Sequence, residues 1–345
     1  MKSLLKNLVL LGVTTLVCIV VGEFAARFAL RDITTTADNR SYFALKWKQA
    51  NVRLNSLGYR DKEPEPAQAG TYRIAFIGDS YTFGQGIPED ARMSNILERE
   101  LRQRRDVQVI NLGNAGNNTM HEVGVLKMAI AKLKPNFVLL QWFVNDVDIA
   151  EVTHDSESAL PAPSRMNEFK MSMRNQSVLY FLAAETWHRY LERSGSGYAE
   201  EMRARFGDPQ SAQSKRAEQA LLQFINLCKD NGIGVGIVLV PYFTPIHGRE
   251  YPFLYLHQRV LATCESQGVP CLDLLPTFSP FMDDDTKYRD LWVNKFDSHM
   301  GPAANQIAAA ALLKFFGAQW TTMNAAAQPG SYSAAGHAAV QASVR

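Results

Sequence analysis

The sequence predicts an α/β protein with three layers, in which a central parallel sheet of about five strands lies between helices. Two observations predict this fold. Short apolar runs alternate along the chain with helical patterns, which is the order that right-handed strand–helix–strand crossovers require. The apolar runs are nearly continuous, as expected of strands buried on both faces. An N-terminal apolar helix precedes this α/β/α sandwich.

Ten segments make up the predicted core. The strands are residues 72–78, 107–113, 136–142, 232–241 and 269–274, and the helices are residues 94–104, 119–132, 210–231, 251–267 and 302–316. Pro302 suits the first turn of the last helix, where a missing N–H does no harm. Ligands of parallel sheets bind at the carboxyl ends of the strands. Polar residues directly after these strands are therefore the candidates for a functional site.

Composition excludes several classes of function. Of the 345 residues 46% are hydrophobic and 20% charged, which is ordinary for a globular protein. A net charge of +2 gives no field that would select nucleic acid. None of the four cysteines forms a CxxC pair and the histidines lack metal-ligand spacing, so we expect no metal and no cofactor. A Cys264–Cys271 disulfide and two free buried thiols both remain open.

The N-terminal segment predicts export. Residues 8–22 are apolar and uncharged and follow Lys2 and Lys6. This run spans ~21 Å, and the next two turns supply the length that a ~30 Å hydrocarbon core requires. Glu23 and Phe24 stand where a cleavage site needs small residues, so we favour an uncleaved anchor over a cleaved signal peptide. The two lysines place the N-terminus in the cytoplasm and the remaining chain on the outer, periplasmic or extracellular side; secretion after cleavage is the alternative.

Five regions follow from these patterns. They are an anchor or signal segment at 1–31, a linker and edge element at 32–69, an α/β domain at 70–320, a helical insertion at 151–208 within that domain, and a disordered tail at 321–345. The tail is dominated by Ala, Ser and Gly without apolar periodicity. The insertion, with a helical pattern at 176–192, has the size of a lid or an interaction surface.

Four polar blocks stand at the positions where chemistry is expected. They are Gly78-Asp79-Ser80 after the first strand, residues 111–119 after the second, Asn145-Asp146 after the third, and Asp297-Ser298-His299 before the last helix. In this order the blocks resemble those of the SGNH (GDSL) hydrolase family, over residues 53–316. The stretch 55–60 is similar to the lead-in of bacterial members with an N-terminal anchor.

The resemblance implies a flavodoxin-like sheet and a role for each block. Ser80 would be the nucleophile, His299 the base, and Asp297 the residue that orients the imidazole. The oxyanion hole would consist of the Ser80 and Gly116 backbone N–H groups and the Asn145 side chain. The sequence departs from the family where Phe143-Val144 precede Asn145 and where Met300-Gly301 follow His299. These departures affect the shape of the pocket and remove no reacting group.

Three functions are open. The resemblance implies a serine esterase, and we expect it to act on O-acetyl groups of an envelope or extracellular polysaccharide. The same triad would serve an O-acyltransferase that moves an acyl group to a glycan hydroxyl. A non-catalytic glycan-binding or scaffolding protein is the third, and occupancy of every triad position argues against it. The partners are an ester or acylated glycan and a membrane; the sequence identifies no protein partner.

Neighbours of the candidate residues have simpler interpretations. Asp79 and Asp146 are expected to cap turns rather than react. Four aromatic residues, Tyr81, Phe83, Trp142 and Phe143, flank the site. They could stack on a sugar, although aromatic residues beside strands are more often part of the core.

Overall fold

A computed structural model of the chain describes residues 2–38, 40–66, 68–149, 165–193, 197–284 and 286–322. It has two compact units: Met1–Asn51 with Val152–Tyr198, and Val52–Glu151 with Ala199–Arg345. We call them the helical unit and the α/β unit. The predicted tail lies outside the described residues from position 323 on, as do residues 150–164 and 194–196 of the predicted insertion.

The α/β unit is built on one parallel sheet. Its strands are β1 (Tyr72–Gly78), β2 (Val107–Gly113), β3 (Phe137–Trp142), β4 (Gly234–Leu239) and β5 (Cys271–Asp273), in the order β2-β1-β3-β4-β5. Every residue of the first four strands is buried, which explains their continuous apolar runs. The predicted three-layer fold with a five-stranded parallel sheet is confirmed.

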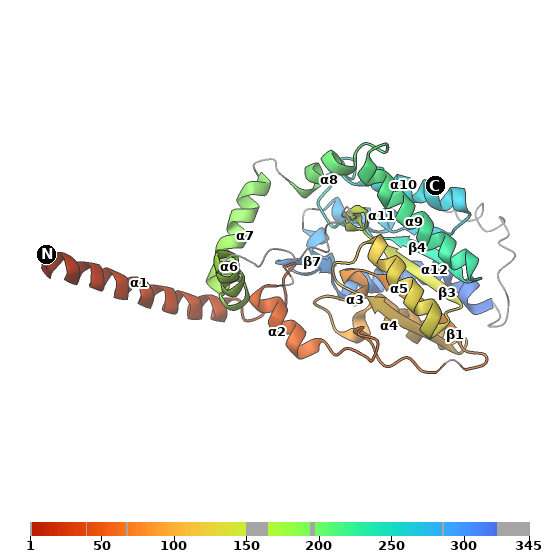
Figure 1. Ribbon diagram of the computed structural model, residues 1–345, viewed down its shortest axis with the longest axis horizontal. Helices are drawn as coiled ribbons and strands as arrows, with labels where there is room; N and C mark the ends of the chain where they lie inside the picture. Colours follow the sequence, from red (N-terminus) through yellow and green to blue (C-terminus); the bar gives the residue numbers. More distant parts are fainter. Residues whose placement is uncertain are drawn as a thin grey trace. The chain divides into compact units, whose positions relative to one another are not determined.

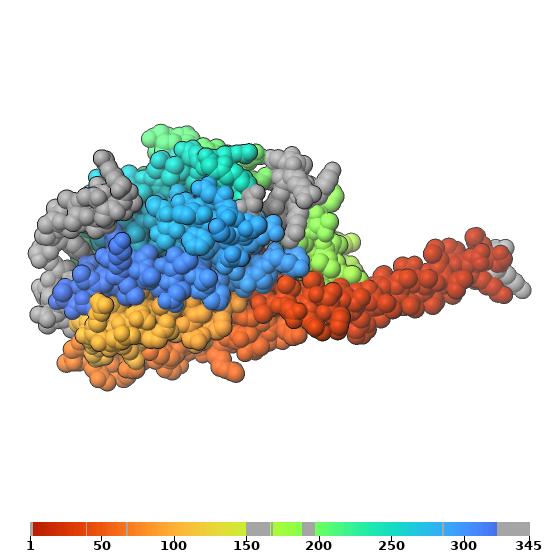
Figure 2. Space-filling model, turned by 180° about the vertical axis from the view of Figure 1, so that it is seen from behind, coloured from red at the N-terminus to blue at the C-terminus, as the bar shows by residue number. Residues whose placement is uncertain are grey.

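Helices cover both faces of the sheet (Figure 1). On one face α5 (Thr119–Leu133) contacts α9 (Ala212–Asp230), which also contacts α10 (Leu254–Gln267). On the other face α4 (Met93–Leu101) contacts α12 (Pro302–Thr322), and Figure 2 shows blue α12 lying along orange α4. The α12 helix continues past its predicted end because Phe316 and Trp320, four residues apart, both pack on the ring of Phe137, with centroids 5.9 and 5.7 Å away.

The sequence patterns missed the short elements. These are α3 (Ser80–Phe83), α8 (Tyr198–Phe206), α11 (Leu275–Met282), the antiparallel hairpin β6 (Trp292–Asn294) and β7 (Asp297–Met300), and the 3₁₀ turns Glu89–Ala91, Val144–Val147 and Lys287–Leu291. Segments of three to nine residues are too short to show a clear period and are stabilised chiefly by tertiary contacts.

The helical unit contains α1 (Lys2–Ala29), α2 (Tyr42–Asn51), α6 (Arg165–Gln176) and α7 (Val178–Arg193). The α2 helix forms within the region predicted as a linker, because Phe43 and Trp47 on one of its faces are buried. The ring of Phe43 meets Phe181 of α7 edge to face, with centroids 5.7 Å apart. Within α1, Ser3–Ala29 is long and apolar enough to cross a membrane; a signal peptide can share these properties.

The cysteines of the α/β unit are free thiols. Cys264 at the end of α10 and Cys271 in β5 are neighbours without a disulfide between them. Burial, and then the adjacent Cys264 thiol, raise the pKa of Cys271 well above its usual value. The Cys271 thiol is therefore held in the protonated form.

Candidate active site

Ser80 lies in a tight turn at the carboxyl end of β1. Asp79 caps α3 by accepting a hydrogen bond from the Tyr81 N–H at 2.9 Å, so its expected role as a cap is confirmed. A Cβ on Gly78 would lie 2.3 Å from Thr82 Oγ1 and 2.7 Å from Gln141 Oε1. Only glycine permits this close turn, which brings the Ser80 side chain to the edge of the sheet.

The structure brings Ser80, His299 and Asp297 together. Nε2 of His299 is 2.9 Å from Oγ of Ser80, and Nδ1 of His299 is 2.5 Å from Oδ1 of Asp297. The same carboxylate oxygen accepts the His299 backbone N–H at 3.1 Å. Asp297 and His299 have side chains on one side of β7 because they are two positions apart on a strand. The β6–β7 hairpin thus carries both groups to a serine 219 positions earlier in the chain.

The electrostatic environment raises the pKa of the His299 imidazole. Burial on its own lowers the pKa of His299, but the charge and hydrogen bond of Asp297, with a smaller contribution from Asp79, raise it above its usual value. Asp297 is completely buried, so its interaction with the imidazole is little screened by water. The site therefore stabilises an imidazolium next to the Ser80 hydroxyl.

The two other candidate residues lie at the same edge of the sheet. Asn145, in the 3₁₀ turn after β3, hydrogen bonds the Asp79 carboxyl through its side chain. Gly116, in the turn after β2, has a φ of 87°, which favours glycine. A Cβ there would meet no described atom within 4 Å beyond its chain neighbours. Strand β1 pairs with β2 on one side and β3 on the other, so these turns flank the topological switch point where ligands bind.

Aromatic rings form one wall beside His299. The Tyr81 ring lies 4.4 Å from Phe143 and 5.3 Å from the His299 imidazole, centroid to centroid. Tyr81 and Phe143 are both mostly buried, which agrees with the core interpretation more than with an open sugar platform. Trp142 faces away from this wall, against His257, at 5.9 Å.

Three completely buried carboxyl groups lie behind the turns. They belong to Asp79, to Asp146 and to Glu122 of α5. Burial raises the pKa of each, and repulsion from the neighbouring carboxyls raises those of Glu122 and Asp146 further. Asp146 accepts the Phe143 N–H at 2.6 Å and so closes the turn that presents Asn145. Glu122 could not be recognised as a site neighbour from the sequence, because an acidic residue in the first turn of a helix is common.

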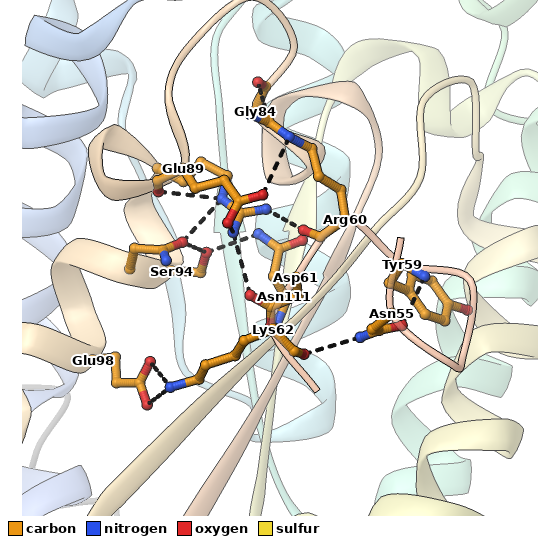
Figure 3. A network of polar contacts seen from close by, with 12 residues as sticks. Asn55, Tyr59, Arg60, Asp61, Lys62, Gly84, Glu89, Ser94, Glu98 and Asn111 are labelled. Carbon is orange, nitrogen blue, oxygen red and sulfur yellow. Dashed lines mark hydrogen bonds and ion pairs between the residues drawn. The ribbon is translucent and has the colours of Figure 1, made fainter. Parts of the chain in front are cut away.

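A buried arginine supports the turn that follows Ser80. The Arg60 guanidinium, 1% exposed, donates to the carbonyl oxygens of Phe83 (3.2 Å), Gly84 (2.7 Å) and Ile87 (2.9 Å). Gly84 in turn donates its N–H to the Ser80 carbonyl oxygen at 3.1 Å. Arg60 therefore fixes the end of α3, and Figure 3 shows it reaching toward Gly84.

The network extends to the second strand (Figure 3). Asp61 accepts the backbone N–H of Asn111 at 2.8 Å and pairs with Arg92 at 3.2 Å, and Arg92 also donates to the Arg60 carbonyl oxygen. At the rim, Lys62 forms an ion pair with Glu98 at 2.7 Å. The lead-in stretch around Arg60 therefore has a structural role next to the site, which sequence patterns alone did not show.

Comparison with known proteins identifies the family of this chain. The sequence matches the GDSL-like lipase/acylhydrolase family over residues 76–307, more than half of the chain and a range that includes all five candidate residues. The chain belongs to this family, and the predicted resemblance is confirmed. It is a hydrolase that acts on ester bonds. No curated protein matches the chain.

Solved structures with a similar arrangement include several esterases. A catalytic mutant of an acetylxylan esterase from Geobacillus stearothermophilus aligns with a TM-score of 0.45 and 15% identity over 74% of this chain and 99% of that one. A putative lipolytic G-D-S-L protein from Desulfitobacterium hafniense aligns with a TM-score of 0.41 and 13% identity, over 70% and 99% of the two chains.

Proposed function

We propose that the protein is a serine esterase in which Ser80, His299 and Asp297 act as one catalytic triad. The observation that carries the proposal is the continuous hydrogen-bonded series from Ser80 Oγ through the His299 ring to Asp297, 2.9 and 2.5 Å long at its two contacts. A serine hydroxyl attacks a carbonyl only when a base removes its proton. His299 is within reach of that proton, and Asp297 fixes which ring nitrogen accepts it.

The reaction has two half-reactions. Ser80 Oγ attacks the ester carbonyl carbon while His299 Nε2 takes the hydroxyl proton, and His299 then gives this proton to the departing alkoxide. The product of this half is an alcohol and an acyl ester on Ser80. Water, deprotonated by His299, attacks the acyl carbon, and the tetrahedral intermediate expels Ser80, which recovers its proton.

The oxyanion of each tetrahedral intermediate needs hydrogen-bond donors. The Ser80 and Gly116 backbone N–H groups and the Asn145 side chain are assigned this role. Their turns share one sheet edge, and the main chain at Gly116 is open to a ligand. Loss of one such donor costs about 2.7–4 kcal/mol of transition-state stabilisation.

The expected substrate is a short acyl ester, with O-acetyl groups of an envelope or extracellular glycan as the preferred class. The aromatic wall of Tyr81 and Phe143 beside His299 supports a small acyl group, because their rings occupy the space next to the imidazole. The α1 helix is assigned as a retained anchor with the α/β unit on the outer side, which suits a polymeric substrate at the cell surface.

The test uses the purified full-length chain in detergent and a short-chain aryl ester. Ser80→Ala should abolish hydrolysis, and a serine-reactive phosphonate should label Ser80. Ser298→Ala is the matched control, because Ser298 points to the opposite side of β7 from the two triad residues. Full activity in the Ser80→Ala chain would refute the proposal.

The same assay separates hydrolase from transferase. Both begin with acylation of Ser80, so the partition of the acyl group between water and a millimolar oligosaccharide acceptor decides between them. Dominant formation of acylated sugar with negligible water turnover would establish the O-acyltransferase alternative.

A further inference from the structure

The start of α7 is bound to the end of α1. The Glu23 carboxylate accepts hydrogen bonds from the backbone N–H groups of Val178 at 2.9 Å and Leu179 at 3.0 Å, and from the Ser177 hydroxyl at 2.9 Å. The first N–H groups of a helix have no partner within the helix and are normally capped by a nearby side chain. Here Ser177 accepts the Tyr180 N–H locally at 3.1 Å, and the acceptor for the two preceding N–H groups comes from a helix more than 150 residues earlier.

A second residue of α1 binds the end of α6. Arg27, one turn after Glu23, pairs with it at 2.7 Å and donates to the carbonyl oxygen of Gln176, the last residue of α6, at 2.7 Å. Arg27 therefore supplies a donor for the C-terminus of α6, and Glu23 supplies an acceptor for the N-terminus of α7. Cleavage of the chain after α1 would remove both contacts, which supports a retained α1 that holds the α6–α7 hairpin.

The α6–α7 hairpin contacts α1 at the depth where α1 would leave a bilayer. Residues 7–22 are uncharged and span ~24 Å, and Lys6 can extend its ammonium group toward the lipid headgroups, so a ~30 Å hydrocarbon core ends near Glu23. The apolar side chains of this run are exposed, Leu16 by 62% and Val21 by 61%. Within the helical unit α6 and α7 run crosswise to α1 (Figure 1). This arrangement would place both helices along the membrane surface.

One face of α7 is directed toward the apolar run of α1. A Cβ on Gly22 would lie 3.3 Å from Leu179 Cδ1, so the Leu179 side chain points back along α1 toward its apolar run. Trp187 follows Leu179 by eight positions, which places it near the same face of the helix, and it is 61% exposed. Phe181, on the opposite face, is buried against Phe43.

The α6 helix adds a second apolar patch. Met166 and Phe169, three positions apart and therefore on one face, are 60% and 59% exposed. Tryptophan is enriched where the acyl chains meet the headgroups, since its ring is apolar and its N–H is polar. Exposed aromatic side chains beside a membrane-spanning helix are typical of segments that lie in the interface.

We infer that α6 and α7 form an interfacial hairpin that rests on a phospholipid leaflet, with Trp187 and Phe169 inserted at the boundary between headgroups and acyl chains. The inference rests on the proposed membrane anchor and is independent of the ester chemistry. It assigns the described part of the insertion, Arg165–Arg193, to lipid binding.

The test reconstitutes the full-length chain in phosphatidylcholine–phosphatidylglycerol vesicles that contain a nitroxide-labelled lipid. The label sits close to the headgroup in one sample and deep in the acyl chain in the other. We expect the shallow label to quench a fraction of the tryptophan emission of the wild-type chain. This quenched fraction should be lost in Trp187→Phe. Trp292→Phe, in the half-buried strand β6, is the matched control and should retain the quenched fraction.

Carbonate extraction of the same vesicles tests the α1 anchor separately from the interfacial α6–α7 hairpin. Release of the protein would refute the anchor and, with it, the hairpin. Retention with equal quenching in wild type and Trp187→Phe would overturn the hairpin alone, and is the result expected if this face binds a protein instead. Retention with loss of shallow quenching in Trp187→Phe supports both.

Discussion

The α/β unit and the α1 helix of the helical unit place their apolar side chains in opposite ways. In the α/β unit the apolar residues of β1 to β4 are all buried, and charged groups inside it, such as Arg60 and Asp297, have polar partners. In the helical unit α1 exposes its apolar residues, Phe24 by 71%, while the carboxylate of Glu23 is enclosed by hydrogen-bond donors. The α/β unit keeps its apolar strands away from solvent, and the helical unit exposes a helix that is long and apolar enough to cross a membrane.

The largest expected effect is a loss of catalysis that leaves the helical unit unchanged. His299→Ala should lower kcat/KM on a soluble aryl ester by about 10⁴-fold or more, as severely as Ser80→Ala, and the double variant should be no slower, because both residues act in one proton transfer. Membrane retention should not change. Trp187→Phe should keep kcat/KM within about twofold, since it lies in the other unit. A double variant far slower than either single one would show that the two residues do not share a step.

A second change tests the charge behind His299. The imidazole must be neutral to accept the Ser80 proton, and its pKa is raised by Asp297, so kcat/KM should fall as the pH drops through a value above the ordinary ~6.5. Asp297→Asn removes the negative charge and should move this acid limb to lower pH, with a rate loss of about 10³–10⁴-fold. The full pH profile is the measurement, and an unmoved acid limb would contradict the assignment.

A third change addresses the support of the α/β unit. Arg60→Met leaves the carbonyl oxygens of Phe83, Gly84 and Ile87 without this donor in a buried place, and should lower the free energy of unfolding by about 3 kcal/mol. Lys62→Met is the control: its ion pair with Glu98 is partly exposed and should be worth under about 1 kcal/mol. Denaturant unfolding, with enzyme activity as the signal, measures the free energy of unfolding of both variants. Equal losses of this free energy in Arg60→Met and Lys62→Met would mean that Arg60 is not a central support.

The smallest effect is expected in the helical unit. Glu23→Ala should destabilise the first turn of α7 by about 1 kcal/mol, the usual value of a helix cap, while Glu23→Gln keeps an acceptor oxygen and should lose less. Hydrogen exchange at the Val178 and Leu179 amides measures the change directly. Glu168→Ala, an exposed position of α6, is the control. Unchanged exchange in Glu23→Ala would show that α1 does not hold the hairpin.

The fold class and the candidate site residues were predictable from the sequence. The runs 72–78 and 107–113 match β1 and β2, because a strand buried on both faces is apolar throughout and polar residues mark its ends. The polar blocks after β1, β2 and β3 contain the candidates Ser80, Gly116 and Asn145, and the block before the last helix contains Asp297 and His299. The strands could be predicted because their patterns repeat within a few residues, whereas the roles of the candidate residues are what the resemblance to the SGNH family implies.

The contacts between distant residues depend on how the chain folds. Ser80 and His299 are 219 positions apart, and the short β6–β7 hairpin that joins them has no sequence period of its own. The cap that Glu23 provides for α7 and the carbonyl oxygens that Arg60 holds are pairings of the same kind. A charged residue needs a polar partner when it is buried. The sequence identifies the charge, but the folded chain determines which partner is within reach.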